Sequence, residues 1–255
     1  HAGCVASTIE AVAPGFWHDT CSAVHPLAIA SPFFRAFGLS RRVDFVTPEI
    51  SFAHPLHPRA GGSGIAYRDL ERTVDALGRD GAAYRRLIAP LAAHAAEVAR
   101  FTGSALLRVP PHPIVTAQFG LRALVQGSPL WNAGFAGEVA PAMITGVAAH
   151  AIVRQPSPVA AAAGLALQTH AHAGGWPIPI GGSQAISDAL ADDLRAHGGE
   201  IVTDHEVTTL DELTARAVVL DVTPRALIRL AGARMPPAYR RRLERFRYGS
   251  GAAKV

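Results

Sequence analysis

The sequence predicts a mixed α/β (α+β) fold that is mostly helical and contains small sheets. Apolar residues recur at helical spacing between residues 69 and 172. Short strand patterns and proline-rich loops fill the region before residue 65, and strand and helix patterns alternate after Gly174. Apolar residues make up 49% of the 255, which is enough to bury a core in one large domain or two small ones.

The first 65 residues should form short strands and loops. Apolar and polar residues alternate at 43–46 and again at 50–53, which is typical of half-buried strands. The glycine-rich segment 61–64 is expected to form a flexible turn beside them. Pro26 and Pro32 break any long helix in this part.

The middle of the chain predicts several helices. Asp69 is expected to cap the first, which Gly78 ends, and Asp80 is expected to cap the next, whose apolar residues continue to Val98. Pro90 should bend or break that second helix. Further helices are predicted at 114–126, 137–153 and 158–172, and the last consists largely of small residues that allow close approach by a neighbour or a flat ligand.

The last third predicts alternating helices and strands. A helix is expected over 183–197, followed by a strand at 200–203 and a buried strand at 217–220. Thr223 should cap a helix that begins at Pro224 and ends before Gly232. A final short helix is predicted over 237–246.

Composition and charge exclude several classes of protein. Only 17% of the residues are charged, which is too few for a disordered chain, and two cysteines are too few for a disulfide scaffold. No run of about 18 apolar residues predicts a stable membrane span. Peripheral membrane contact stays open, and we expect a cytoplasmic protein. The net charge of +4 and the arginine-rich segment 240–247 are interpreted as a solvated amphipathic helix, with no nucleic-acid partner.

No motif predicts a metal site or a nucleophilic catalyst. His170 and His172 are two residues apart, so they point about 200° apart on a helix. The chain contains neither a paired-histidine zinc motif nor a C-x-x-C motif. The pair Gly181 and Gly182 precedes a helix, where backbone can approach an anionic ligand. An ordinary tight turn is the alternative interpretation of this pair.

Four segments resemble a known enzyme family. The sequence GGSQAISDALADDLRAHGGEIVTDHEV, from Gly181 to Val207, resembles the central flavin-contacting stretch of the phytoene desaturase-like, amine-oxidase-type FAD oxidoreductases. ARAVVLDVTPRAL, from Ala215 to Leu227, resembles the strand, turn and helix that follow it there. Segments 14–34 and 236–255 resemble the phytoene dehydrogenase-related branch of this superfamily.

The resemblance implies a flavoenzyme with an interrupted domain layout. Residues 1–38 and 172–232 would form part of a Rossmann-like FAD-binding domain, and residues 39–171 and 233–255 a mostly helical substrate domain. The implied activity is removal of a hydride from a largely apolar small-molecule substrate onto FAD. Helix 158–172 and segment 178–180 would help to wall the substrate site.

The resemblance also implies which residues meet the cofactor. His25 would lie near the flavin ring, where it could accept a proton, although a loop histidine bonded to backbone is the alternative. The other implied FAD contacts are Gly3, Ser7, Gly181, Gly182, Val207, Asp221 and Thr223.

The sequence also departs from the family pattern. It contains no G-x-G-x-x-G turn, and the family's C-terminal flavin segment is missing. We therefore expect the chain to be an internal part of a longer protein and to bind FAD poorly by itself. A flavin amine oxidase is one alternative, which the 7% aromatic content disfavours. A non-catalytic helical interaction protein on a flavoprotein-like scaffold is the other.

Overall fold

The computed structural model describes residues 8–10, 12–57, 62–105 and 109–251. It is 52% helical and 8% strand, which confirms a mixed α+β fold that is mostly helical. The described strands pair as three separate two-stranded antiparallel sheets. A parallel sheet of the kind that a Rossmann-like unit requires is not present among these residues, so that part of the prediction finds no support here.

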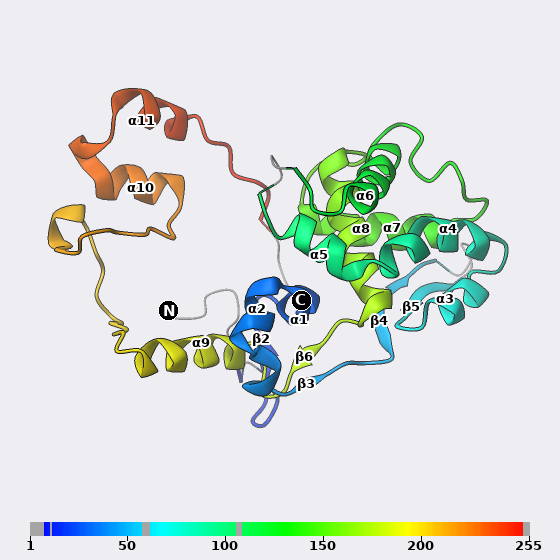
Figure 1. Ribbon diagram of the computed structural model, residues 1–255, viewed down its shortest axis with the longest axis horizontal. Coiled ribbons are helices and arrows are strands. Elements are labelled where there is room, and N and C mark those ends of the chain that lie inside the picture. Colours follow the sequence, from blue (N-terminus) through cyan, green and yellow to red (C-terminus); the bar gives the residue numbers. More distant parts are fainter. Residues whose placement is uncertain (1–7, 11, 58–61, 106–108, 252–255) are drawn as a thin grey trace.

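A helical body forms the largest part of the fold, between residues 50 and 173 (Figure 1). It begins with the hairpin β4 (Ile50–Pro55) and β5 (Ser63–Tyr67). Six helices follow: α3 (Leu70–Ala76), α4 (Gly81–Ala92), α5 (Ala95–Thr102), α6 (Pro113–Gln126), α7 (Val139–Ala148) and α8 (Pro158–Ala173). Helix α8 lies in the centre and contacts α4, α5, α6 and α7.

The core of the body is built from the apolar faces of these helices. Tyr84, Ile88 and Leu91 of α4 are fully buried and pack with Phe119 of α6 and Leu165 of α8. Burial of such large side chains contributes about 1.5–3 kcal/mol each to folding. The predictions 114–126 and 158–172 agree with α6 and α8 to within one residue, whereas 137–153 is too long, because α7 ends at Ala148. The helix does not break at Pro90, which lies inside α4; α4 ends at Ala92 and α5 starts at Ala95.

A second group of elements comes from both sides of the body in the sequence. It contains β1 (Thr8–Ile9), β2 (His18–Asp19), α1 (Pro26–Ala30), α2 (Pro32–Phe37), β3 (Phe45–Val46), β6 (Ile178–Pro179) and α9 (Gln184–Ala196). Strand β3 pairs with β6, so the chain enters and leaves the helical body at one place. Ala28, Leu39, Val43 and Ile186 form its small core.

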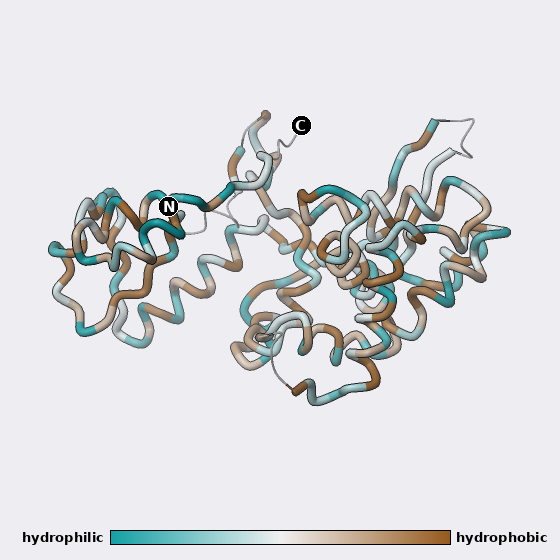
Figure 2. The backbone as a smooth tube through the Cα atoms, turned by 90° about the horizontal axis from the view of Figure 1, so that it is seen from above, coloured by the Kyte–Doolittle hydropathy of each residue, from teal (hydrophilic) through white to brown (hydrophobic). Residues whose placement is uncertain are grey.

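The last part of the chain, residues 213–251, is called the C-terminal arm below. It contains α10 (Pro224–Ala231) and α11 (Pro237–Glu244), which pack against each other. The arm lies apart from the helical body in two perpendicular views (Figures 1 and 2). Thr223 caps α10, since its Oγ1 accepts a hydrogen bond from the backbone N–H of Ala226, as predicted.

Two predicted strands are wrong. Residues 200–203 and 217–220 form no strand, and the expected buried strand contains Val219 with 97% of its surface exposed. An extended segment becomes a strand only when a neighbour supplies partners for its backbone N–H and C=O groups. No other strand of the described residues lies beside these two segments.

No helix in the described ranges combines the length and the apolar character that crossing a bilayer requires. The division into a cofactor domain and a substrate domain stays a prediction.

Candidate functional site

The candidate site is an apolar cleft of about 630 Å³ between the helical body and helices α1 and α2. Its walls come from α5, α8 and the segment that carries α1 and α2. The lining is mostly small or apolar: His25, Leu27, Ala28, Ser31, Pro32, Phe34, Ala99, Thr102, Gly103, His150, Ala163, Ala166 and Leu167. A volume of this size is typical of small-molecule sites in proteins.

The cleft stays open because its walls carry small side chains. Helix α8 presents Ala163 and Ala166 there, and Gly103 directly follows the end of α5. Of the residues that these two helices contribute to the lining, Leu167 alone has a large apolar side chain, so most of the space against α1 and α2 stays unfilled. Small residues of helix 158–172 therefore line a cavity, as expected from the sequence. Segment 178–180 was also expected to line the site, but it pairs with β3 and is not part of the wall.

His25 lies at the edge of the cleft and is held from two sides. Its backbone N–H donates to the carbonyl of Pro177 at 2.9 Å. Its ring Nε2 lies 2.7 Å from the Oγ of Ser183. The Ser183 hydroxyl in turn donates to the carbonyl of Ser22 at 2.6 Å.

These contacts fix the protonation of the His25 ring. A carbonyl oxygen can only accept, so the single hydroxyl hydrogen of Ser183 is used toward Ser22. The bond between His25 and Ser183 then requires Nε2 to carry the hydrogen and donate it. Nδ1 is consequently the ring atom with a lone pair, which is the form that can accept a proton.

The pKa of His25 agrees with a neutral ring. Burial lowers this pKa below its usual value, and the Asp19 carboxylate and the Ser22 backbone offset the effect only in part. A histidine whose pKa is lowered in this way is neutral at pH 7 and can act as a base.

Asp19 and Thr8 complete the arrangement at the start of α9. The Asp19 Oδ1 accepts the Ser183 backbone N–H at 2.7 Å and the Thr8 hydroxyl at 2.6 Å. The Thr8 Oγ1 also accepts the N–H of Gln184 at 3.2 Å. Two of the amide groups that every helix start leaves unpaired are therefore satisfied by the chain itself.

Ser183, His25 and Asp19 resemble a catalytic triad in composition, but not in geometry. Ser183 is completely buried and its hydroxyl hydrogen is used toward a backbone carbonyl. The His25 ring is oriented by the serine, whereas Asp19 accepts hydrogen bonds from the helix start and from Thr8. Ser183 is accordingly a positioning residue and no nucleophile.

The paired glycines lie directly before this helix start. Gly181 and Gly182 have φ angles of 81° and 90°, which favour glycine. A Cβ atom on Gly182 would collide with the Thr8 side chain, whereas one on Gly181 would meet open space. The pair therefore forms a tight turn against Thr8.

The remaining predicted FAD contacts are not gathered at this site. Val207 lies in the irregular segment after α9, whereas Asp221 and Thr223 both belong to the C-terminal arm, where Thr223 caps α10. Gly3 and Ser7 lie outside the described residues. The structure thus brings His25 together with Gly181 and Gly182, but not with Val207, Asp221 or Thr223.

The described residues do not fit an FAD diphosphate at α9. A phosphate binds at a helix start through unpaired amide groups. Here the amides of Ser183 and Gln184 already donate to Asp19 and Thr8. The carboxylate of Asp19 would also repel a second negative group at this position.

The structure contains two polar features that the sequence analysis did not find. One is the bond from His25 to Ser183, which joins residues 158 positions apart and has no local signal. The other is a buried group in the body, where the Tyr84 hydroxyl lies 3.1 Å from Gln168 Oε1 and 2.8 Å from His172 Nε2. Gln168 and His172 are four residues apart on one helix, which is a spacing that places them on one face.

Histidines do not gather into a metal site in the part of the chain that is described. No group of three or more histidine, cysteine or acidic side chains there is arranged to hold a metal ion. His172 lies against Tyr84, while His150 packs edge-on against Trp176.

Comparison with known proteins assigns no family, because neither a protein-family model nor a curated protein sequence matches this chain.

Proposed function

We propose that this chain binds a largely apolar small molecule in the cleft beside His25. We also propose that it does so as part of an FAD-dependent oxidoreductase of the phytoene dehydrogenase-related type. The observation that carries the proposal is the cleft itself, a space of about 630 Å³ lined mostly by apolar side chains and edged by one oriented histidine. The resemblance of segments 14–34 and 181–207 supports the redox class.

The lining favours an apolar ligand over a polar one. Alanine, leucine, proline and phenylalanine side chains form most of the wall, and burial of apolar surface against them is favourable by about 25 cal/mol per Å². His25, His150, Ser31 and Thr102 are the only side chains in it with hydrogen-bonding groups. Such a lining recognises shape and apolar character, with few polar contacts to set the orientation.

His25 supports a step in which the ligand loses a proton. Oxidation of a carbon–carbon or carbon–heteroatom single bond removes a hydride from one atom and a proton from its neighbour. The Nδ1 lone pair of His25 can take this proton, because Ser183 holds the Nε2 hydrogen. The hydride acceptor implied by the resemblance is FAD, for which the described residues form no site. The domain division and the FAD contacts therefore remain part of the proposal.

A binding experiment on the 255-residue chain tests the cleft. The probe is 1-aminoanthracene, a neutral apolar molecule whose fluorescence rises when it leaves water. We expect saturable binding, and we expect Ala163→Phe to weaken it at least tenfold because the new ring occupies the cleft. Ala96→Phe, on an exposed position of α5, is the matched control and should bind as the unchanged chain does.

The result separates the proposal from its alternatives. Absence of saturable binding, or equal loss in both variants, would contradict an apolar site and favour the non-catalytic interaction protein. Circular dichroism melting of both variants excludes loss of folding as the cause. Reduction of FAD by an amine, and not by an apolar substrate, in a longer protein that includes this chain would favour the amine oxidase.

A further inference from the structure

The charges of this chain are strongly separated along the sequence. Residues 216–251 contain nine arginines and only two acidic residues, whereas residues 1–215 contain 14 arginines and 18 acidic residues. The C-terminal arm therefore carries an excess of seven positive charges, and the rest of the chain up to residue 215 has an excess of four negative charges. The net charge of +4 conceals this difference.

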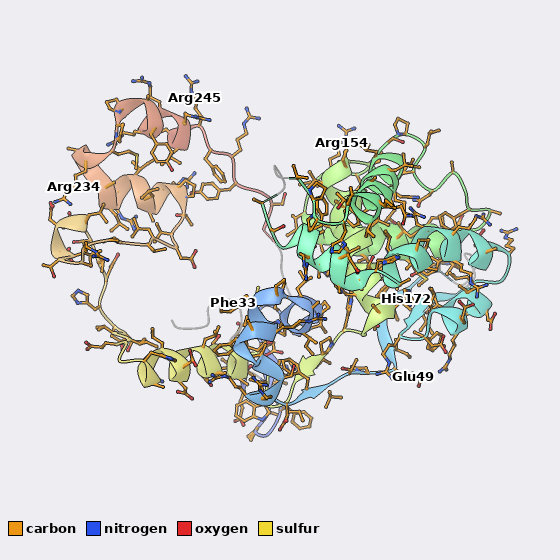
Figure 3. All side chains as sticks on the ribbon, viewed as in Figure 1. Phe33, Glu49, Arg154, His172, Arg234 and Arg245 are labelled. Carbon is orange, nitrogen blue, oxygen red and sulfur yellow. The ribbon has the colours of Figure 1, made fainter. Side chains whose placement is uncertain are left out.

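The arginines of the arm are exposed. All nine lie at the surface, and two of them form ion pairs, Arg234 with Asp211 and Arg240 with Glu244. Arg225 lies over the ring of Tyr248, 5.2 Å from its centre. The other six form no ion pair within the described ranges: Arg216, Arg229, Arg241, Arg242, Arg245 and Arg247. Figure 3 shows Arg234 and Arg245 at the outer edge of the arm.

Aromatic side chains are exposed in the same segment of the arm as most of these arginines. Tyr239 of α11 has 49% of its surface exposed, and Phe246 and Tyr248 directly after it have 52% and 44%. The pattern of α11 places Tyr239 and Leu243 on one face, which in a packed helix would be buried. In the arm Tyr239 stays exposed, whereas Leu243 is half-buried because α11 packs against α10.

We propose that this basic and aromatic surface of the arm binds an anionic lipid surface. Arginine attracts phosphate and carboxylate headgroups, and exposed tyrosine and phenylalanine side chains insert at the level of the headgroups. A surface of both kinds matches a membrane interface, which is charged outside and apolar a few ångströms below. The proposal does not rest on the proposed oxidoreductase function or on the cleft.

The arrangement of the aromatic rings favours lipid over nucleic acid. Single-stranded nucleic acid binds by stacking bases on open ring faces. Here Phe246 and Tyr248 meet edge to face, with 76° between their planes, and Arg225 lies over the face of Tyr248. These rings leave no pair of parallel platforms, while their edges can still enter a headgroup layer.

Sedimentation of the whole 255-residue chain with lipid vesicles tests the proposal. We expect binding to vesicles of phosphatidylcholine mixed with phosphatidylserine, and little binding to phosphatidylcholine alone. Each arginine near an anionic surface contributes roughly fivefold to binding. The combined variant Arg241→Gln, Arg242→Gln and Arg245→Gln should therefore bind about 100-fold more weakly. None of these three arginines forms an ion pair in the arm, so their replacement leaves the contacts within the arm intact.

The matched control makes the same charge change on exposed arginines outside the arm, Arg41→Gln, Arg86→Gln and Arg154→Gln. It should bind almost as the unchanged chain does. A second variant, Tyr239→Ser with Phe246→Ser, should still prefer vesicles that contain phosphatidylserine. It should lose the part of the binding that persists at high salt, because that part comes from the aromatic side chains.

Three outcomes would overturn the proposal. They are equal binding to both kinds of vesicle, equal loss in the arm variant and the control, and displacement of the chain from vesicles by an oligonucleotide that the arm binds more tightly. Circular dichroism of each variant shows that the fold is retained.

Discussion

The Nε2 of His25 lies 2.7 Å from the Oγ of Ser183, and this contact joins the segment before α1 to the start of α9 across 158 residues. It connects a residue at the edge of the apolar cleft to a fully buried serine. The orientation and protonation of the histidine consequently depend on a residue that cannot itself touch a ligand.

Replacement of this serine should change the tautomer of His25. In Ser183→Ala the ring loses the hydroxyl oxygen that accepts from Nε2, so the hydrogen should distribute between the two nitrogens. Nitrogen chemical shifts of the histidine rings, measured by NMR, report this directly. Stability should also fall by about 1–3 kcal/mol, since the Ser22 carbonyl loses its donor. An unchanged Nε2-protonated spectrum would show that Ser183 does not set the tautomer.

The two neighbouring glycines before α9 should respond differently to alanine. Gly181→Ala carries only the cost of a positive φ angle, about 1–2 kcal/mol, because open space surrounds its Cβ position. Gly182→Ala has the same backbone cost, and its new Cβ atom also collides with Thr8. This variant should therefore lose clearly more stability than Gly181→Ala. Urea unfolding of the two variants measures the difference. Equal stabilities would mean that Thr8 does not pack against this turn.

The buried tyrosine of α4 should be sensitive to loss of its hydroxyl group. Tyr84→Phe leaves Gln168 and His172 without their shared partner in a region from which water is excluded. The expected loss is about 1–3 kcal/mol. Tyr239→Phe, which removes an exposed hydroxyl, is the control and should change stability by less than about 0.5 kcal/mol. Similar losses of stability in the two variants would show that the hydrogen bonds of the Tyr84 hydroxyl do not stabilise the fold.

Two buried histidines should make the fold weaker in mild acid. Burial lowers the pKa of His170 and His172 to about 4, and Arg35 adds to the effect at His170. Between about pH 6.5 and pH 4 the unfolded chain therefore binds protons that the folded chain does not. Stability should decline as the pH falls through this range, by about 3 kcal/mol for each histidine.

Unfolding by urea at several pH values checks this. In His170→Gln the decline should be smaller than in the unchanged chain, whereas His205→Gln, at an exposed position, should leave the decline as it is. Stability that does not depend on pH in this range would contradict the buried, neutral state of both rings.

The 255-residue chain should not bind FAD with appreciable affinity. The amides at the start of α9 are already used, and Val207, Asp221 and Thr223 lie away from Gly181 and Gly182. Purified chain mixed with FAD and then passed through a desalting column should show no flavin absorbance. A yellow protein with one FAD per chain would contradict the expectation and would place the cofactor at a site other than the start of α9.

The helices could be predicted well, because their signals are local. Asp69 caps α3 as expected, with its Oδ1 accepting the N–H groups of Glu71 and Arg72. Asp80, expected to do the same for α4, is instead buried and accepts the N–H groups of Ala136 and Gly137, far along the chain. A carboxylate before a helix looks the same in the sequence whether it bonds to its own helix or to a distant loop.

The strands and the site were predicted less well, because both depend on distant partners. The alternation at 50–53 became a strand since 63–67 lies beside it, whereas 200–203 and 217–220 have no such neighbour in the described ranges. His25 was singled out through the resemblance, but its partner Ser183 could not be found from spacing. The arginines at 240–247 are evident in the sequence, but the sequence alone does not show that they lie in an arm that packs apart from the helical body.

The pairing of β3 with β6 has a consequence for how this chain can be altered. Phe45 and Val46 lie opposite Pro179 and Ile178, so the ends of the whole intervening segment meet at neighbouring strands about 5 Å apart. Segments whose ends meet in this way can be exchanged, transplanted or expressed by themselves with a short linker closing the gap. The helical body is thus an insertion that can be exchanged as one piece, and an exchanged body would meet the same cleft wall from α1 and α2.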